Sequence, residues 1–389
     1  MNTQKISITA FSSISPLGSN KDEVWEKYLD GKHCFTKQFL DQQDTFIAAL
    51  STDSKQLIAQ IRESDPKYKF LDDSVLFALA ASRKAVQNAG WSSEDVFGIN
   101  IGSSRGATDL FEKHYKEYIE TGKAQTLASP TTTLGNISSW IAHDLQSDGP
   151  EISHSITCST ALHSLLNGVA WLKSGMSDKF LVGGSEAPLT DFTIGQMRAL
   201  KIYSRIDQES DSWPNLAFDF EKTQNTMILG EGAAVCCLES GEKENAIAYV
   251  TGVGYATEIL EHNISISAEA DCFQKSMKMA LKDTDLDSVD VIVMHAPGTI
   301  KGDLTELRAI EKVFGSKQPL LTTNKWKIGH TFGASGILSL ELALLMMEHD
   351  IFVETPFSKR ITKDKPIKKV LINAVGFGGN AVSILIEKP

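Results

Sequence analysis

The sequence predicts a fold of the α/β class, on three observations. Short runs of apolar and β-branched residues, each about the length of a strand, recur along the 389 residues. Longer stretches with apolar residues at helical spacing lie between these runs, so that predicted strands and helices alternate. Neither a short-period repeat nor a low-complexity tract interrupts the alternation. We therefore expect sheets that are covered by helices.

The predicted elements follow one another in chain order. Short β-branched or alternating runs predict strands at residues 96–102, 152–157, 179–182, 248–253, 289–294, 369–374 and 381–387. Longer runs with apolar residues three and four positions apart predict helices at residues 74–88, 159–173, 271–281, 304–314 and 337–347.

Composition and charge limit the classes of function. Hydrophobic residues make up 42% of the chain and charged residues 22%, which is typical of a globular protein. The net charge of −11 argues against wholesale binding of nucleic acid. No stretch is apolar enough to span a membrane, and the first residues lack the apolar core of a signal peptide. Five cysteines without a C-x-x-C pair indicate a reducing compartment and no structural zinc, so the expected location is cytoplasmic.

Cys158 stands where a predicted strand, residues 152–157, turns into a predicted helix, residues 159–173. Unpaired N–H groups and the positive end of the helix dipole favour a thiolate at such a position. A lone cysteine in a chain of this kind is more often a small buried hydrophobe. A catalytic role for Cys158 therefore needs partners elsewhere in the sequence.

His295 is the first candidate partner. It ends a predicted buried strand, and a loop leads from it to Asp303 and a predicted helix. Asp303 and Glu306 have the spacing of a helix N-cap and its capping-box partner. A lone histidine at a strand end is commonly a satisfied structural residue, so this position alone decides nothing.

His330 is the second candidate partner, in a segment with glycines at 329, 333 and 336 that allow close backbone approach. Lys325 lies five positions before it. A lysine and a histidine at a glycine-rich helix entry fit either a solvated loop or a site for a thioester carbonyl or a phosphate.

A turn of sequence Gly-Phe-Gly-Gly-Asn, residues 376–380, joins the last two predicted strands. Glycines on both sides of Phe377 are good material for an ordinary hairpin turn. The same turn can also direct main-chain N–H groups into a cavity.

Taken together, these segments resemble the elongating β-ketoacyl-acyl carrier protein synthases of the thiolase superfamily. Each segment alone is a weak signal, but their order along one chain is specific. The matching segments are residues 8–18, 156–161, 183–186, 198–200, 218–219, 229–233, 325–330, 333–336 and 376–379. The resemblance implies a thiolase-like fold with two similar halves in a five-layered αβαβα arrangement. An acidic segment at 239–244 is the expected join between an N-terminal half, residues 1–243, which carries Cys158, and a C-terminal half, residues 244–389, which carries both histidines.

The match at His295 depends on the register of the comparison. The family pattern is Ala-His-Gly-Thr followed by Gly-Asp and a Glu, whereas this chain has His-Ala-Pro-Gly-Thr at 295–299. A match on the last four residues would put Pro297 in place of the histidine. A match without a gap keeps His295 eight positions before Asp303, and we adopt it. Thr299 then takes a position that contacts the pantetheine arm of the substrate.

The resemblance also implies a role for each candidate residue. Cys158 is the nucleophile, and His295 and His330 hold the thioester carbonyl of the second substrate. The main-chain N–H groups of Cys158 and Phe377 form the oxyanion hole, and Phe377 gates the cavity. The supporting residues are Lys325, which assists His330, Glu306, which orients Lys325 or solvent, and Asp303.

Three departures from the family pattern leave the acyl chain open. Residues 220–228 replace the usual Arg-Asp-Gly-Phe segment, Val375 replaces a phenylalanine, and the usual threonine before Asn380 is missing. These positions shape the acyl pocket in the family, and they leave the chemistry of the reaction unchanged. Fatty-acid, polyene and polyketide synthesis all remain open.

The resemblance implies no cofactor, because the phosphopantetheine of an acyl carrier protein carries both substrates. The acidic carrier protein calls for a basic patch, for which Lys67, Lys69, Lys201 and Arg205 are weak candidates. Residues 126–144 correspond to a dimer contact of the family, so a homodimer is expected and a heterodimer with a ketosynthase-like subunit is an alternative.

Two other functions remain open at this point. A chain-length-factor-like partner subunit is one, but such partners usually lack the active cysteine that Cys158 provides. A thiol hydrolase or simple acyltransferase is the other, but hydrolysis needs one base, and this chain has both His295 and His330.

Overall fold

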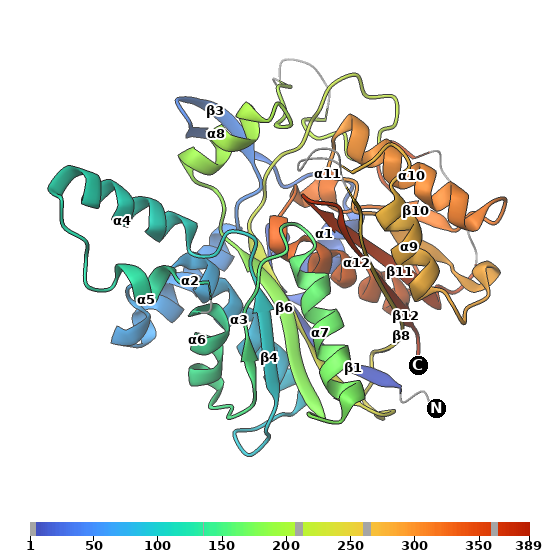
Figure 1. Ribbon diagram of the computed structural model, residues 1–389, viewed down its shortest axis with the longest axis horizontal. Coiled ribbons are helices and arrows are strands. Elements are labelled where there is room, and N and C mark those ends of the chain that lie inside the picture. The colour runs from blue at the N-terminus through green and yellow to red at the C-terminus, as the bar shows by residue number, and fades with distance from the viewer. Residues whose placement is uncertain (1–4, 135, 207–212, 260–265, 359–364) are drawn as a thin grey trace.

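The computed structural model describes residues 5–134, 136–206, 213–259, 266–358 and 365–389. It has two five-stranded mixed sheets (Figure 1). In spatial order, the first sheet contains β1 (Ile6–Ile14), β7 (Gly232–Ser240), β6 (Lys179–Glu186), β4 (Gly98–Gly102) and β5 (Glu151–Ile152). The second contains β8 (Ala248–Thr257), β12 (Asn380–Glu387), β11 (Lys369–Gly376), β9 (Val291–Val293) and β10 (Leu320–Thr322).

The two sheets repeat one plan. In each, the first strand of the half pairs antiparallel with the last strand, β1 with β7 and β8 with β12. That last strand pairs antiparallel with the next, β7 with β6 and β12 with β11, and the remaining strands are parallel. The predicted α/β class is therefore confirmed.

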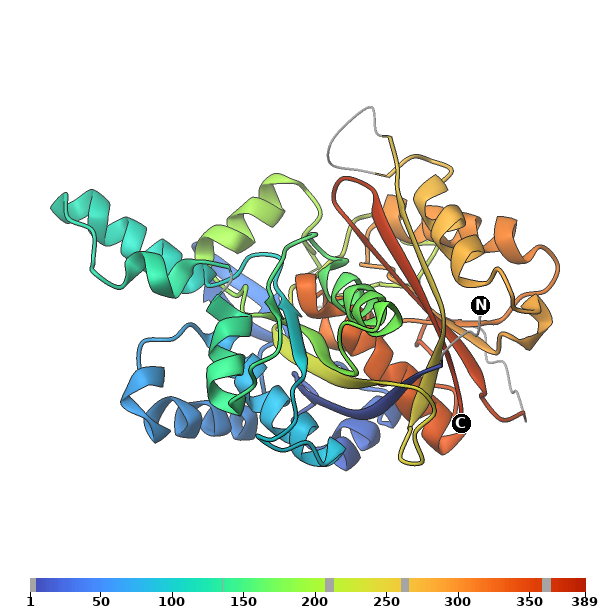
Figure 2. The same cartoon turned by 60° about the horizontal axis from the view of Figure 1, so that its bottom comes forward.

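Successive side chains of a strand point to opposite faces of the sheet and pack in different hydrophobic cores. The helices that complete each core therefore form separate layers. On β11, Ile372 packs with the helices between the sheets, whereas Leu371 packs with those on the far side. The middle layer contains α7 (Thr160–Ser174) and α12 (Ser335–His349), and α12 is buried from Ser335 to Met347. The outer layers contain α3 (Asp73–Ala89) and α6 (Asn136–Leu145) on the first sheet, and α9 (Asp271–Ala280) with α10 (Ile300–Phe314) on the second. The order is thus helices, sheet, helices, sheet, helices (Figure 2).

The remaining elements lie around these layers. They are α1 (Lys21–Leu29), β2 (Thr36–Leu40), β3 (Gln43–Ile47), α2 (Thr52–Ser64), α4 (Thr108–Thr121), α5 (Ala128–Thr132), α8 (Asp191–Ala199), α11 (Lys325–Ile328) and the 3₁₀ turns Pro66–Tyr68, Leu286–Ser288 and Phe332–Ala334. None of the helices in the described ranges has the length and apolarity needed to cross a bilayer.

Two predicted boundaries are wrong in ways that affect the site. β5 ends at Ile152, so residues 153–157 are not the predicted strand, and the described chain there has only an isolated bridge between Ile156 and Cys158. Helix α10 begins at Ile300, four residues earlier than predicted, and its N-cap is Thr299 rather than Asp303. The Thr299 hydroxyl accepts a hydrogen bond from the N–H of Gly302 at 3.2 Å, as an N-cap should.

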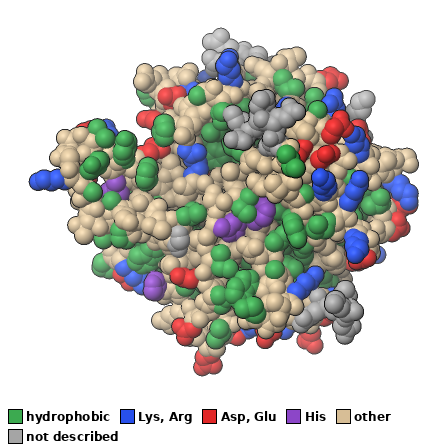
Figure 3. All heavy atoms as spheres, in the orientation of Figure 1, with side chains coloured by type: hydrophobic (Ala, Val, Ile, Leu, Met, Phe, Trp, Pro, Cys, Tyr) green, Lys and Arg blue, Asp and Glu red, His purple; other side chains and the backbone are tan. Residues whose placement is uncertain are grey.

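Helix α4 projects from the body of the molecule as an arm (Figures 1 and 2). Of its residues only Thr108 is buried. Apolar side chains gather on the projecting lobe in Figure 3. The large apolar side chains that α4 exposes are Phe111, Tyr115, Tyr118 and Ile119.

Candidate active site

One cavity of about 250 Å³ brings together residues that lie far apart in the sequence. Cys158, His295, His330 and Phe377 all line it. Most of the other lining residues are apolar or belong to the loop before α10: Leu200, Ile202, Asn225, Met227, Ile266, Pro297, Thr299, Lys301, Gly302, Phe332, Val375 and Gly376. Its position between loops of both halves, its size and its convergent polar groups are typical of a small-molecule site.

Cys158 lies two residues before the first residue of α7, in a strained turn. Thr157 has a positive φ of 48°, and Ser159 makes no side-chain cap on the helix. The thiol is only 6% exposed. Burial, and then the charge of Glu186, raise its pKa to about 12, against the opposing effects of Lys325, the backbone N–H and Arg105. The prediction that Cys158 is a thiolate is therefore wrong for the free protein. The cost of burying the charge is larger than the stabilisation that the helix N-terminus gives it.

The Gly376–Asn380 turn packs directly on the turn that carries Cys158. A Cβ atom at Gly376 would lie 1.8 Å from Oγ1 of Thr157 and 2.8 Å from the carbonyl oxygen of Ile156, so only glycine fits. The turn joins β11 and β12 in an antiparallel hairpin, and its Phe377 side chain lines the cavity with 38% of its surface exposed. The hairpin and the cavity wall, which the sequence left as alternatives, are thus one feature.

The rings of His295 and His330 contact each other at the wall of the cavity. Their rings meet edge to face, with centroids 5.1 Å apart and planes at 88°. His330 is held by its backbone: its N–H donates to the carbonyl of Ile228 at 2.7 Å, and its own carbonyl accepts from Gly230 at 3.1 Å. Burial and the positive charge of Lys325 lower the pKa of His330 to about 3. Burial, His330 and Lys325 lower the pKa of His295 well below its usual value, so both rings are neutral at pH 7.

Glu306 supports the loop that carries His295. Its carboxylate accepts hydrogen bonds from the main-chain N–H groups of His295 and Ala296, both at 2.9 Å, and from the side-chain amide of Asn373 at 3.3 Å. Burial raises the pKa of Glu306 to about 7, against those hydrogen bonds.

Asp303 closes the other end of the same loop. It accepts hydrogen bonds from the N–H groups of Gly298 and Phe218, and it forms a buried ion pair with Lys222 at 2.7 Å. Lys222 was not predicted as a site residue, although it lies in the divergent segment 220–228. That segment also contributes Asn225 and Met227 to the cavity wall.

Lys325 is buried behind the histidines. Its ammonium group donates to Oδ1 of Asn324 at 2.9 Å and to the hydroxyl of Ser339 at 3.1 Å. Burial lowers the pKa of Lys325 to about 8, against the charges of Glu306, Cys158 and Asp303. Lys325 thus acts on Glu306 and on both histidines through its charge, and its hydrogen bonds go to two uncharged groups that the sequence analysis did not identify.

Glu186 is buried close enough to Cys158 for its charge to raise the pKa of the thiol. The carboxylate accepts hydrogen bonds from the hydroxyl of Ser103 and from the N–H groups of Ser104, Arg105 and Gly333. It therefore joins the loop after β4 to the loop after His330. The predicted Gly-Gly-Ser-Glu segment contained this residue, but nothing in that pattern revealed its partners.

Among the described residues, no three His, Cys, Asp or Glu side chains are placed so that they could hold a metal ion. Besides Asn225, Thr299 and Lys301, the polar groups of the cavity are one thiol, two neutral imidazoles and main-chain N–H groups. The thiol, the imidazoles and the N–H groups suit an acyl thioester.

Comparison with known families gives matches along most of the chain. Residues 3–244 match the β-ketoacyl synthase N-terminal domain, and residues 247–357 match the β-ketoacyl synthase C-terminal domain. The 3-oxoacyl-[acyl-carrier-protein] synthase 2 of Coxiella burnetii is 26% identical over 421 aligned positions, which cover 100% of this chain and 99% of the relative.

Solved structures share the fold at low sequence identity. The ishigamide ketosynthase/chain length factor superposes with a TM-score of 0.84 at 21% identity, over 99% of both chains. A type II polyketide synthase acyl-carrier protein in complex with its ketosynthase, AntDE:AntF, contains a chain that superposes with a TM-score of 0.86 at 20% identity, over 99% of this chain and 100% of the other.

Proposed function

The chain belongs to the β-ketoacyl synthase family, and we propose that it joins an acyl group held on Cys158 to the carbanion left when a malonyl thioester loses carbon dioxide. The observation that supports this best is that Cys158, His295 and His330 line one cavity although they come from both halves of the sequence. The family, predicted from the order of short segments, is confirmed.

In the first half-reaction, the sulfur of Cys158 attacks the carbonyl carbon of an acyl thioester. The oxyanion that forms accepts hydrogen bonds from the main-chain N–H groups of Cys158 and Phe377. The carrier thiolate leaves and takes up the proton that Cys158 gives up, so the balance is one thioester exchanged for another. A protonated Cys158 in the free protein fits this order, because the proton is released as the acyl group arrives.

In the second half-reaction, the malonyl thioester enters beside the two histidines. Neutral imidazoles each carry one N–H, and those of His295 and His330 donate to the thioester carbonyl oxygen. The bond to the carboxylate breaks, carbon dioxide leaves, and its electron pair passes into the enolate that these donors stabilise. The enolate carbon attacks the acyl carbonyl on Cys158, and the thiolate of Cys158 leaves and takes up a proton from solvent.

The substrates would arrive on the phosphopantetheine arm of an acyl carrier protein, with no further cofactor. Thr299 and Pro297 line the cavity and would contact that arm. Arg205 lines a separate polar hollow with Lys37 and Arg198, and it is a candidate contact for an acidic carrier protein. Of these, Arg198 already pairs with Asp41 at 2.8 Å.

The exposed apolar face of the α4 arm would be covered in a dimer. Four large apolar side chains on one helix form an exposed apolar patch, and such patches commonly mark surfaces where proteins associate. A second copy of the chain is the occupant we propose, and a ketosynthase-like subunit is the alternative.

Intact-protein mass spectrometry tests the proposal. The purified protein is mixed with acyl-carrier protein and then with malonyl-carrier protein, and the Cys158→Ala variant serves as the comparison. We expect the wild-type chain to gain the acyl mass and then to yield a β-ketoacyl carrier protein, and the variant to do neither. Acyl transfer without the β-keto product would contradict the condensation and favour a simple acyltransferase.

A further inference from the structure

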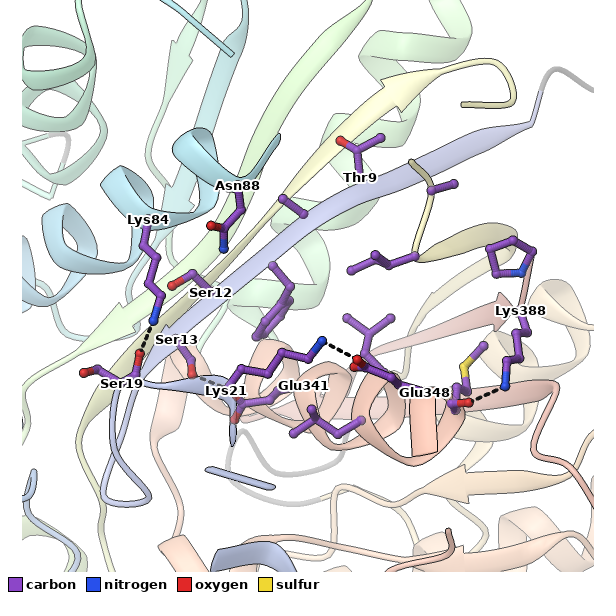
Figure 4. A pocket seen from close by; sticks show the side chains of 18 residues that line it. Thr9, Ser12, Ser13, Ser19, Lys21, Lys84, Asn88, Glu341, Glu348 and Lys388 are labelled. Carbon is purple, nitrogen blue, oxygen red and sulfur yellow. Dashed lines mark hydrogen bonds and ion pairs between the residues drawn. The ribbon is translucent and has the colours of Figure 1, made fainter. Parts of the chain in front are cut away.

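A second cavity, of about 490 Å³, lies between β1, α3 and α12 (Figure 4). It shares no lining residue with the candidate active site. Charged residues stand around it and largely satisfy one another: Lys21 pairs with Glu348, Lys84 donates to the carbonyl of Ser19, and Lys388 pairs with Asp350. The residue that these pairs leave out is Glu341.

Glu341 lies at the wall of this cavity and is 4% exposed. The hydroxyl of Ser13 donates to its Oε1, and the phenol of Tyr28 is the other hydrogen-bonding neighbour of the carboxylate. Burial raises the pKa of this carboxyl to about 7, against Ser13 and Tyr28. A buried carboxyl that faces a cavity and has a pKa near neutral can gain or lose its charge with a small change in its surroundings.

A chain of buried polar groups leads from Glu341 to the active-site lysine. Tyr28 is the first member, and burial together with the charge of Glu341 raises the pKa of its phenol. The side-chain amide of Asn324 donates to the Tyr28 hydroxyl at 3.4 Å and to the carbonyl of Leu338 at 3.0 Å. Its other atom, Oδ1, accepts from the ammonium group of Lys325 at 2.9 Å.

The hydrogen bonds in this series of polar groups all run in one direction, from Lys325 toward Glu341. Lys325 donates to Asn324, Asn324 donates to Tyr28, and the phenol of Tyr28 donates to the Glu341 carboxylate. The amide of Asn324 cannot flip without turning its N–H groups toward the ammonium group of Lys325. An ionised Glu341 at the far end therefore favours the orientation that holds Lys325 protonated.

Helix α12 contributes one residue that contacts Lys325 and another that lines the second cavity. Ser339, which accepts from Lys325, and Glu341, which lines the second cavity, are two positions apart on this helix. Side chains two positions apart point about 200° away from each other around a helix. Helix α12 thus presents Ser339 toward Lys325 and Glu341 toward the second cavity on its opposite face.

We propose that Glu341 is a positioning residue for Lys325, acting from the second cavity through Tyr28 and Asn324. This inference rests on the proposed function, since the positive charge of Lys325, close to His295 and His330, would stabilise the enolate to which those histidines donate. Loss of the Glu341 charge loosens Asn324, and a Lys325 ammonium group with a weaker acceptor loses its proton at lower pH.

Few charged or titratable groups act on Lys325 and Glu341, the two ends of this series of hydrogen bonds. Lys325 is influenced by Glu306 and Asp303 of α10, by Cys158, and by the nearby histidines. Glu341 is influenced by Ser13 of β1 and Tyr28 of α1. The cavity that it lines also contains Lys21, Lys84, Glu348 and Lys388.

The test is the pH profile of carbon dioxide release from malonyl-carrier protein by wild type and Glu341→Gln. In wild type, release falls as pH rises through the pKa of Lys325, about 8. In Glu341→Gln, we expect this fall to move to lower pH by about half a unit or more. An unshifted profile in Glu341→Gln would overturn the inference.

Control variants separate a specific shift of the pH profile from a general loss of activity. Glu348→Gln removes a carboxylate from the rim of the same cavity and the same helix, and it should leave the profile unchanged. Tyr28→Phe should shift the profile as Glu341→Gln does, and the double variant should shift it no further. If either variant fails to fold, Ser13→Ala weakens the same carboxylate and should give a smaller shift in the same direction.

A direct measurement does not depend on turnover. Titration of Lys325 by NMR, with its signal assigned through Lys325→Arg, should give a lower pKa in Glu341→Gln than in wild type. If wild type releases no carbon dioxide but the Lys325 pKa still shifts, the proposed function fails and the coupling stands. If the pKa does not move, the coupling fails on its own.

Discussion

Cys158 is a buried thiol, and desolvation decides its charge. The helix N-terminus and Lys325 favour the thiolate, but burial raises the pKa of the thiol to about 12. Spacing in the sequence located the helix entry to within one residue, but it could not give the depth of burial. That depth depends on Gly376 and Phe377, which lie more than 200 positions away in the chain.

Alkylation of the free protein tests the charge of this thiol. Because the thiolate reacts and the thiol does not, we expect the rate of iodoacetamide labelling at Cys158, mapped by mass spectrometry, to keep rising through alkaline pH. Cys158→Ala identifies labelling at the other cysteines. A plateau of the rate near neutral pH would contradict the raised pKa.

Lys222 and Asp303 form the ion pair that fixes the loop between His295 and α10. Both side chains are buried, with 1% and 0% of their surface exposed. Lys222→Met leaves the Asp303 carboxylate without its cation, and we expect a loss of about 3 to 5 kcal/mol in the free energy of unfolding, measured with urea.

The exposed pair of Lys317 with Asp287 provides the matched control. Lys317→Met should change the free energy of unfolding by less than about 1 kcal/mol. Equal losses in the two variants would mean that the Lys222 pair is not buried as described.

At the scale of elements, the sequence predicted helices better than their ends. The apolar spacing located α3, α7, α9 and α12 to within two residues at each end. The start of α10 was missed because Thr299 and Asp303 are both good N-caps, and only tertiary contacts decide between them. Asp303 is drawn away to Gly298, Phe218 and Lys222, so the cap falls to Thr299.

The turn between β11 and β12 places an N–H group and an aromatic ring at the cavity only if its first residue has no side chain. In Gly376→Ala, the new methyl group would meet Thr157 and Ile156, so the turn must move away from Cys158. We expect at least a tenfold loss of acyl transfer, because donors to an oxyanion act only when correctly placed. Single-turnover acylation of Cys158 measures it.

Gly315→Ala is the control for this variant. A Cβ atom at Gly315 meets nothing within 4 Å, although its φ is +60°. It should lower the melting temperature slightly, by backbone strain alone, and leave acyl transfer intact. A Gly376→Ala enzyme as active as Gly315→Ala would show that the turn does not position the oxyanion donor.

At the scale of the whole molecule, two sheets of the same strand order pack on one shared layer of helices. The α/β class followed from alternation along the chain, but the repeat of the strand order was not visible as sequence similarity between the halves. It is carried by backbone pairing, which many different side chains can support. The candidate site was likewise found as separate segments, and only the packing of both halves brings Cys158 to His295 and His330.

The α4 arm makes a prediction about assembly. Replacing Phe111 and Ile119 by glutamate puts charges on the exposed apolar face, so we expect the protein to change from dimer to monomer in light scattering coupled to size-exclusion chromatography. Tyr255→Glu, at an exposed aromatic on β8 of the second sheet, should leave the mass unchanged. A wild-type monomer, or a dimer that survives both substitutions, would contradict this use of the arm.

The most direct test of the central claim is carbon dioxide release by the Cys158→Ala chain. In the proposed reaction, His295 and His330 remove carbon dioxide from the malonyl thioester without help from the thiol. Cys158→Ala should therefore still release carbon dioxide from malonyl-carrier protein while forming no β-ketoacyl product, and adding His295→Ala should reduce the release by at least about a hundredfold. Release that is lost with Cys158→Ala alone, or that survives the loss of His295, would contradict the claim that the paired neutral histidines carry out the decarboxylation.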